Sequence, residues 1–345
     1  LAPPVLLQTG SRILAAKEGT SPHRRTLRME LLPQPFSAPG QWYRGCLHVH
    51  TTESDGSMAS QRLIEHYRMG GFDFIAVTDH EKITDCTNLS TPDFLILRGA
   101  EYRGGPAAAG SMFHIVGINL EGDCRRRDGM GSQDVIDEIR RIGGEAIIAH
   151  PYWSGLTTAD LLSVRDYLAI EVFNATCETA IARGLSSVHW DDLLTQGRLV
   201  RAVASDDSHR PGFDSLRAWT VVRAAELTRS AIMEALRQGH FYASTGPEIY
   251  DVQVDGNEVR VACSAAQTIA LVADPTKGAQ LGAGRYGPAT RARRPRGAQL
   301  TQALCDGHSL VGAIFTLRGT ERYARIEVTD AQGRRAWTNP LFLQP

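Results

Sequence analysis

Between about residues 43 and 245, short runs of apolar and β-branched residues alternate with segments in which apolar residues recur at helical spacing. Continuous apolar runs of this length are typical of strands buried on both faces, and the helical segments between them indicate βα units around a mostly parallel sheet. Ser or Thr stands at plausible helix starts, and Gly stands where the helices should end. The predicted strands are GCLHVH, FDFIAVTDH, FLILRGAEY, MFHIVGINL, GEAIIAHP, LAIEVFNA, RLVRAVASDDSH and RAWTVVRA, and the predicted helices include MASQRLIEHYRMGG, SQDVIDEIRRIGG, SSVHWDDLLTQG and TRSAIMEALRQGH.

From about residue 246 the pattern changes to strict alternation of apolar and polar residues, with turn dipeptides such as Asp255-Gly256. This alternation predicts a small antiparallel β module. Residues 1–42 are rich in Pro and Ser and show no sustained period, so we expect an extension that packs on another part of the protein. The predicted organisation is an N-terminal extension (1–42), an α/β domain (43–245) and a C-terminal β module (246–345).

Composition excludes several classes of protein. Hydrophobic residues make up 42% and charged residues 22% of the 345 residues, as in ordinary globular proteins. The formal net charge of -1 gives no overall field for nucleic acid or an anionic membrane, and no apolar stretch approaches the roughly 20 residues needed to cross a bilayer. We expect a soluble, cytoplasmic protein, with a removed export signal left open. The six scattered cysteines form no CxxC pair, so we expect them to be reduced and mostly buried.

Two motifs in the C-terminal part have ordinary explanations. Gly282, Gly284 and Gly287 match GxGxxG, but Pro288 follows and no helical pattern comes after it, so a dinucleotide site is not expected. The Arg-rich run at 291–296 is interpreted as a solvated loop rather than a nucleic-acid patch.

Polar residues with metal-binding side chains stand at the ends of successive apolar runs. In a β/α barrel these strand ends converge on one face, which carries the active site. Neutral imidazoles and carboxylates bind zinc, manganese or iron, and two histidines separated by one strand residue point to the same side. Each residue alone has a common structural explanation, such as core packing, a turn or a helix cap, but together they predict a metal centre. They are His48, His50, Asp55, His80, Glu101, His114, His150, Asp206 and His209.

The order HxH, D, TDH, E, H, HP and DxxH over residues 43–212 closely resembles the PHP family of metal-dependent hydrolases, named for polymerase and histidinol phosphatase. The resemblance implies a distorted (β/α)7 barrel that holds two or three divalent ions. It assigns His48, His50, Glu101 and Asp206 to one ion. Glu101 would bridge to a second ion with His114 and His150, and Asp55, His80 and His209 would hold a third.

A second resemblance concerns the C-terminal stretch, where GHFYASTGP precedes the β module that ends in RRAWTNPLF. This arrangement is similar to the CehA/McbA branch of the same family, named for carbaryl hydrolase. The branch implies cleavage of carbamates or carboxyl esters, whereas the wider family implies phosphoester hydrolysis.

The expected chemistry is attack by a metal-bound hydroxide on phosphorus or on a carbonyl carbon of a small-molecule ester. Asp207 adjoins two predicted ligands and, like Asn174, is expected to position them. Substrate contacts are predicted for Glu171, which could instead orient ligands, and for Arg103 and Arg183, because arginine donates two hydrogen bonds to one phosphate.

Four functional interpretations remain open at this point. A phosphoesterase is favoured over a carbamate or carboxyl ester hydrolase, and Cys177 as a nucleophile is a poor third because a catalytic Cys needs a local base. A non-catalytic metal-binding regulatory module is the alternative of a different class, which the complete set of predicted ligands disfavours. His189, in a helical pattern, is expected to be a packing residue.

Overall fold

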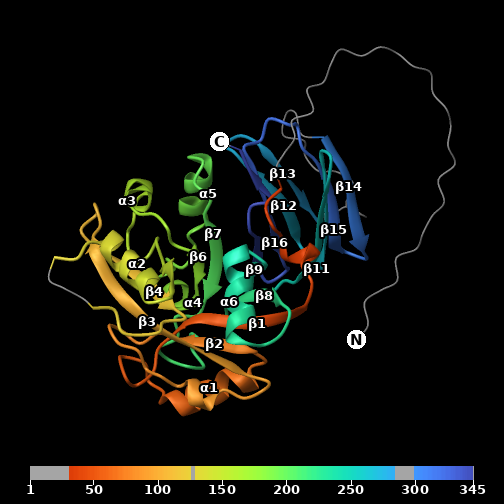
Figure 1. Ribbon diagram of the computed structural model, residues 1–345. Helices are drawn as coiled ribbons and strands as arrows, with labels where there is room; N and C mark the ends of the chain where they lie inside the picture. Colours follow the sequence, from red (N-terminus) through yellow and green to blue (C-terminus); the bar gives the residue numbers. More distant parts are fainter. Residues whose placement is uncertain (1–30, 126–128, 284–298, 345) are drawn as a thin grey trace, which may run out of the picture.

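The computed structural model describes residues 31–125, 129–283 and 299–344. Its backbone forms a large mixed sheet and a separate four-stranded sheet, with few helices (Figure 1). The predicted α/β class is confirmed in this coarse form. Most of residues 1–42, the glycines at 284 and 287, and the Arg-rich run at 291–296 lie outside the described residues.

The part of the protein that carries the predicted metal ligands is built on seven neighbouring strands of the large sheet, in the order β1 to β7. Each coincides with one of the predicted apolar runs. β1 pairs with β2 and β2 with β3 in parallel, and so do β5 with β6 and β6 with β7. The strands are β1 (Gln41–Val49), β2 (Phe74–Val77), β3 (Leu95–Pro106), β4 (Met112–Ile118), β5 (Glu145–Ile148), β6 (Ala169–Asn174) and β7 (Arg201–Ser205).

β4 departs from the predicted regular βα repeat, because it runs antiparallel to both β3 and β5. Only residues 107–111 join β3 to β4. A parallel crossover needs a dozen or more residues, so this short connection allows a hairpin alone. The amino-terminal half of β4 therefore lies at the same end of the sheet as the carboxyl ends of its neighbours.

Closure of the seven strands into a barrel is not confirmed, because no ladder joins β7 to β1 in the described part of the chain. The strands do touch at their carboxyl ends, where Val49 and Ser208 form an isolated parallel bridge. The His50 amide donates to the Ser208 carbonyl at 3.1 Å, and the Asp207 amide donates to the His48 carbonyl at 2.9 Å. These bonds place the HxH and DDSH segments side by side.

The four predicted helices are present, and two shorter ones accompany them. In α6 the Thr228 side chain accepts a hydrogen bond from the Ala231 amide, and Gly239 ends the helix in the left-handed region (φ 82°), as the sequence predicts. α4 begins directly after β6, capped by the Asn174 side chain. The helices are α1 (Ser60–Met69), α2 (Ser132–Arg141), α3 (Thr158–Ser163), α4 (Ala175–Ile181), α5 (Ser187–Thr195) and α6 (Arg229–Gln238), with 3-10 turns at Pro35–Ser37 and Thr87–Leu89.

The C-terminal strands continue the sheet of the metal-binding half. From β1 the sheet extends through β8, β9, β17, β16 and β12 to β13, while β10, β11, β15 and β14 form the second sheet. The pairing of β9 with β17 crosses the predicted boundary at residue 245, and the division into domains stays a prediction. These strands are β8 (Trp219–Ala224), β9 (Phe241–Ser244), β10 (Ile249–Asp255), β11 (Glu258–Ala266), β12 (Thr268–Ala273), β13 (Gly278–Gly282), β14 (Gln299–Asp306), β15 (Ser309–Thr316), β16 (Tyr323–Thr329), β17 (Arg335–Thr338) and β18 (Phe342–Leu343).

The described end of the N-terminal extension packs on the β module. Leu31 forms an isolated bridge with Phe342, and the Leu32 amide donates to the Leu341 carbonyl at 2.9 Å. All six cysteines are free and five are buried, as expected for most of them, while Cys305 is exposed. Among the described residues, no helix has the length and apolar character needed to span a membrane.

A buried arginine ties the β module to helix α5. Arg325 on β16 is 1% exposed, and its guanidinium donates to both carboxylate oxygens of Asp191 on α5, at 2.8 and 2.7 Å. It also contacts Glu327 at 3.2 Å and lies 4.8 Å from the centre of the Trp190 ring. Glu327 also lies 3.4 Å from Arg335, so Arg325 matters most as the cation paired with Asp191.

We expect Arg325→Met to lower the free energy of unfolding by about 3 kcal/mol, since it leaves the partly buried carboxylate of Asp191 without its cation. Urea unfolding followed by fluorescence measures the change. Arg260, an exposed residue paired with Glu258 on the surface, provides the matched control, and Arg260→Met should change the stability by less than about 0.5 kcal/mol. Equal effects of the two substitutions would contradict a special role for Arg325.

Candidate metal centre

Most of the predicted ligands gather at the carboxyl ends of the strands, and the others reach the same place from within a strand or from the start of one. His48 and His50 end β1, and His150 follows β5. Glu101 lies within β3, and His114 reaches the same place from the start of the antiparallel β4. Four groups of side chains in the described chain have ligand atoms close enough to hold ions. The first three are His48, His50, Glu101 and Asp207; Glu101, His114 and His150; and His50, Asp55, His80 and His209. The fourth, His150, Cys177 and Asp207, shares two of its three members with the first two groups.

The first group has the dimensions of a tetrahedral site. The Nε2 atoms of His48 and His50 are 3.1 Å apart, and each lies 3.3 Å from Glu101 Oε2. Asp207 Oδ1 is 3.1 Å from His48 Nε2 and 3.0 Å from His50 Nε2. Ligands about 2.0–2.1 Å from a zinc ion at the centre of a tetrahedron would be roughly 3.3 Å apart. These four atoms therefore fit one divalent ion.

One buried oxygen supports this fit independently. Asp207 Oδ1 is buried and accepts no hydrogen bond, although two imidazole nitrogens lie within 3.1 Å of it. A buried carboxylate oxygen without a partner carries a large desolvation cost. A cation bound between the two ring nitrogens and this oxygen would provide the missing partner.

Glu101 joins the first group to the second. Its Oε2 faces the first group, while Oε1 lies 2.8 Å from His114 Nδ1 and 3.2 Å from His150 Nε2. The two oxygens thus face two different positions, which is the geometry of a bridging carboxylate. This agrees with the role that the family resemblance implied for Glu101.

The third group is more open than the other two. Asp55 lies 3.4 Å from His80 Nε2 and 3.3 Å from His209 Nε2, and 3.7 Å from His50 Nδ1. The Asp55 side chain is 55% exposed, whereas Glu101 is almost fully buried. An ion held here would be the most accessible to solvent and the easiest to exchange.

The aspartate of the first group is Asp207, and the prediction of Asp206 is wrong in this respect. The Asp206 carboxylate accepts hydrogen bonds from the amides of residues 216, 217 and 218 and from the Tyr67 hydroxyl. Burial raises its pKa to about 7, against the lowering effect of these bonds. Adjacent residues at a strand end point to opposite sides, and Asp207, with φ 54°, is the one turned toward the histidines.

Glu171 and Asn174 lie behind the ligands. Glu171 Oε1 is 2.9 Å from His48 Nδ1, and its Oε2 accepts from the His150 amide and from Asn174 Nδ2. Asn174 also donates to Asp207 Oδ2 at 3.1 Å. Glu171 is 1% exposed and does not line the pocket, so the predicted contact with substrate is not found. Its contacts with His48 and His150 match the alternative prediction that it orients ligands. Such partners fix the orientation of ligand rings.

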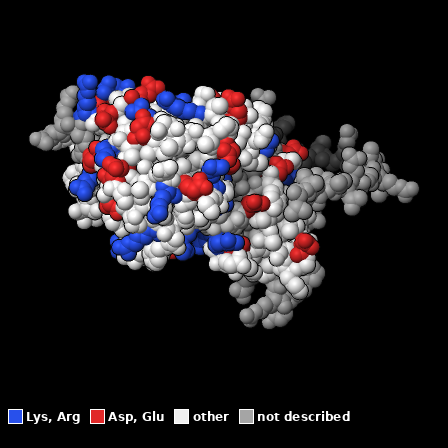
Figure 2. Space-filling model, turned by 90° about the horizontal axis from the view of Figure 1, so that it is seen from below, with Lys and Arg blue, Asp and Glu red and all other residues white. Residues whose placement is uncertain are grey.

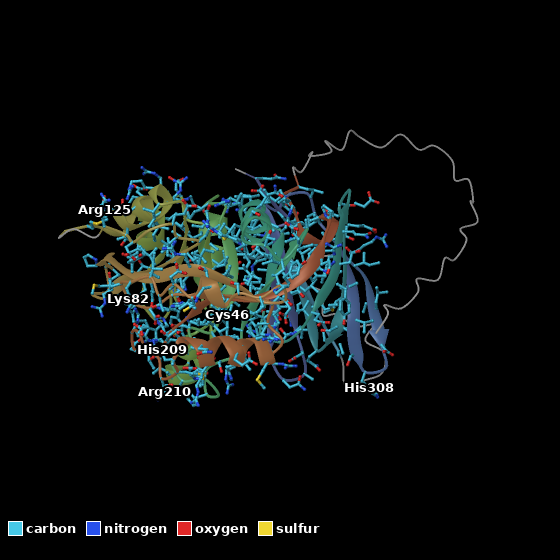
Figure 3. All side chains as sticks on the ribbon, turned by 60° about the horizontal axis from the view of Figure 1, so that its bottom comes forward. Cys46, Lys82, Arg125, His209, Arg210 and His308 are labelled. Carbon is cyan, nitrogen blue, oxygen red and sulfur yellow. The ribbon has the colours of Figure 1, made fainter. Side chains whose placement is uncertain are left out.

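A pocket of about 450 Å³ opens over the centre, and its lining does not include the two arginines that were predicted to contact substrate. Arg103 and Arg183 are exposed, and neither lines the pocket. The arginine that does is Arg210, which follows His209 directly in the sequence (Figure 3). That adjacency to a predicted ligand was a usable signal. The other lining residues are Asp55, His80, Glu101, His114, His150, Trp153, Thr176, Cys177, Ala180, Asp207, His209, Phe213 and Asp214.

Two predictions about other residues can be judged from their surroundings. Burial, and then the charges of Asp207 and Glu171, raise the pKa of the Cys177 thiol far above its usual range, which disfavours a thiolate nucleophile. His189 lies on α5, where its Nε2 is 3.0 Å from the Leu156 carbonyl, in agreement with a packing role.

The carboxylates of the centre raise the pKa values of His48, His50 and His150. Burial lowers the pKa of His50, but the carboxylates of Asp207 and Glu101, 3.0 and 3.3 Å from its Nε2, outweigh burial and raise the value to about 9. The pKa of His48 is also raised, since Asp207, Glu171 and Glu101 together outweigh burial. Burial opposes ionisation of Glu101, yet His48, His114 and His150 hold the pKa of that carboxyl well below its usual range. Cations are therefore strongly favoured at this position.

Comparison with known proteins gives a consistent but distant likeness. No family model matches the sequence, and no curated protein matches it. A two-domain protein from Bacteroides vulgatus that contains a predicted PHP-like metal-dependent phosphoesterase is 17% identical, with a TM-score of 0.46, over 89% of this chain and 95% of that one.

Two further structures resemble a smaller part of the chain. An amidohydrolase from Chromobacterium violaceum, with bound sulfate and no metal, is 15% identical with a TM-score of 0.38, over 57% of this chain and 96% of that one. A presumed metal-dependent phosphoesterase from Bifidobacterium adolescentis is 14% identical with a TM-score of 0.39, over 56% and 96%. Of these three structures, the one from Bacteroides vulgatus is described as PHP-like. The CehA/McbA branch is not confirmed, and the case for function rests on the side chains described above.

We expect Asp207→Asn to weaken zinc binding by more than about tenfold without unfolding the protein, because it removes a charged ligand. Asp206→Asn should keep the metal but lower the free energy of unfolding by about 2 kcal/mol, since an amide nitrogen cannot accept from the buried backbone N–H groups. Metal content by mass spectrometry and urea unfolding measure the two effects. The opposite pattern would return the ligand role to Asp206.

Zinc binding at pH 7 should release protons, because His50 with a pKa of about 9 is protonated in the metal-free protein and must be neutral to bind. Affinity should therefore rise as the pH is raised toward 9. Calorimetry in two buffers of different ionisation enthalpy counts the protons. Asp207→Asn should release fewer, since Asp207 is the largest of the partners that raise this pKa; a buffer-independent enthalpy would disprove the protonated starting state.

Proposed function

We propose that the protein is a metal-dependent phosphoesterase that hydrolyses a small phosphomonoester at the centre built around Glu101. The three groups of ligands suit two or three divalent ions, such as zinc, manganese or iron. When bound, such ions lower the pKa of a coordinated water and stabilise the negative charge that develops on the attacked group. The positioning of the ligands and the contact with phosphate are provided by the protein's own side chains.

The positions of the ligands are held by residues that do not face the pocket. Glu171 orients the His48 ring, and the Ser154 hydroxyl lies 3.0 Å from His150 Nδ1. The Asp79 carboxylate accepts from the Thr51 amide and the Ser54 hydroxyl, which fixes the turn that carries Asp55. A centre held in this way is arranged before substrate arrives, which favours catalysis over simple storage of metal.

The observation that favours a phosphoester over a neutral ester is Arg210. Its guanidinium is exposed, lines the pocket of the metal centre, and has no hydrogen bond or ion pair with any described residue. A phosphate dianion accepts two hydrogen bonds from such a group, whereas a carbamate gains little from it. Positive and negative side chains are interspersed on the face that Figure 2 shows.

The charge of the pocket explains why metal ions must come first. Four carboxylates, Asp55, Glu101, Asp207 and Asp214, line it together with Arg210 and with His80, His114, His150 and His209. Once the histidines are neutral, as metal binding requires, the four carboxylates outweigh Arg210 and would repel a phosphate dianion. Two or three divalent ions reverse its sign, so substrate binding and metal binding are coupled.

Arg210→Met should lower kcat/KM for 4-nitrophenyl phosphate by about 10- to 100-fold, mainly through KM, because a hydrogen bond to a charged group is lost. Turnover of a naphthyl N-methylcarbamate, if present, should be little changed. Arg183→Met, an exposed arginine outside the pocket, is the matched control and should leave both unchanged.

The assay uses zinc-loaded and manganese-loaded protein, with Asp207→Asn as the metal-site control. Phosphate release that is lost in Asp207→Asn supports the proposal. Carbamate cleavage without phosphate release would favour the carbamate hydrolase instead, and a metal-loaded protein inert toward both would favour the regulatory metal-binding module.

A further inference from the structure

The pocket over the metal centre has a second wall of different character. One part of the lining consists of the candidate metal ligands, and another part comes from the turn after β5, from α4 and from the loop after β7. This second part includes Trp153, Ala180 and Phe213, together with Thr176 and Cys177. The side chains of Trp153, Ala180 and Phe213 have no atoms that could bind a metal ion or a phosphate group by charge.

Two large rings in this wall remain substantially exposed. Trp153 is 40% and Phe213 is 51% exposed, although most aromatic rings of the metal-binding half are buried. Exposed aromatic surface inside a pocket costs free energy until something covers it, since each Å² of apolar area removed from water contributes about 25 cal/mol. A substrate that carries apolar surface would recover this energy on binding.

Trp153 is held in place by the metal centre itself. Its ring lies edge-on against those of His114 and His150, with centroid separations of 5.7 and 4.9 Å. The turn that carries it is closed by a hydrogen bond from the Ser154 amide to the His150 carbonyl. The ring is therefore fixed directly beside the position where the second metal group would bind substrate.

Phe213 is fixed by a different contact. The neighbouring Asp214 is 2% exposed, and its carboxylate accepts from the Ser208 hydroxyl and from the amides of His209 and Arg210. This network ties the loop of Phe213 to the segment that carries Asp207, His209 and Arg210. The aromatic wall, the cation and the metal groups are consequently parts of one rigid arrangement.

The size of the pocket allows an occupant larger than phosphate. At about 450 Å³ it lies within the range of roughly 300–1,000 Å³ that is typical of small-molecule sites. A phosphate group at the metal ions and Arg210 would leave space toward the second wall. That space is bordered by rings and small side chains rather than by hydrogen-bonding groups suited to a sugar or a polyol.

We propose that the substrate is a phosphomonoester of an aromatic or similarly flat apolar alcohol, whose ring contacts Trp153 and Phe213. This inference rests on the proposed phosphoesterase function and specifies its substrate class. Hydrolysis adds one water across the ester: the water oxygen bonds to phosphorus, the bond from phosphorus to the alcohol oxygen breaks, and that oxygen takes a proton. The products are the alcohol and inorganic phosphate.

The test measures selectivity and binding separately in the full chain loaded with zinc. Selectivity is the ratio of kcat/KM for 1-naphthyl phosphate to that for glycerol 2-phosphate. Trp153→Ala and Phe213→Ala should each lower this ratio about tenfold, the loss expected when a hydrophobic contact is removed. Trp153→Phe keeps a ring and should restore most of the ratio, and Tyr250→Ala, an exposed aromatic on β10 outside the pocket, should leave it unchanged.

Binding is followed by calorimetry with 1-naphthylmethylphosphonate and methylphosphonate, which are not hydrolysed. We expect the naphthyl compound to bind more tightly, and Trp153→Ala to remove most of that advantage. Equal affinity of the two phosphonates, or a ratio that neither ring variant changes, would overturn the aromatic subsite while glycerol phosphate turnover upheld the phosphoesterase. Ring-dependent binding without release of phosphate from either ester would overturn the proposed function and leave the aromatic subsite standing.

Discussion

The burial of one carboxylate, that of Glu101, is the interaction on which the centre depends. A charged carboxylate inside a protein is stable only with cations or hydrogen-bond donors around it. Both of its oxygens face imidazole nitrogens, His114 and His150 on one side and His48, His50 and His80 on the other. Five strands or strand ends must meet within a few ångströms for this to occur. The irregularities of the fold, above all the antiparallel strand β4, serve that convergence.

The functional residues are arranged in layers around this carboxylate. Ligand atoms point into the pocket, and a layer behind them, chiefly Glu171 and Asn174, sets the directions of the rings. Behind this layer, the Asp206 carboxylate accepts hydrogen bonds from the amides of residues 216–218 and so holds that backbone beside the end of β7. Two neighbouring aspartates of one motif thus have different tasks, one toward metal ions and one toward the protein backbone.

Several contacts attach the β module to this arrangement. β17 continues the sheet by pairing with β9, Arg325 joins β16 to α5 through Asp191, and the Asn339 side chain accepts from the Ala202 amide on β7. None of these residues lines the pocket over the metal centre. The pocket is lined by residues at the strand ends and in the segments that follow them.

The sequence by itself determined the strands and helices of the first half, because buried strands and amphipathic helices have distinct periodicities. It also determined most of the candidate ligands, because they stand at strand ends. Only the tertiary structure decided between Asp206 and Asp207. Adjacent residues face opposite sides, and the backbone conformation at this point, with a positive φ at Asp207, determines which of the two carboxylates faces the histidines. The tertiary structure also decided the direction of β4 and the lining of the pocket by Arg210, Trp153 and Phe213. These depend on contacts between segments far apart in the chain, which local patterns do not encode.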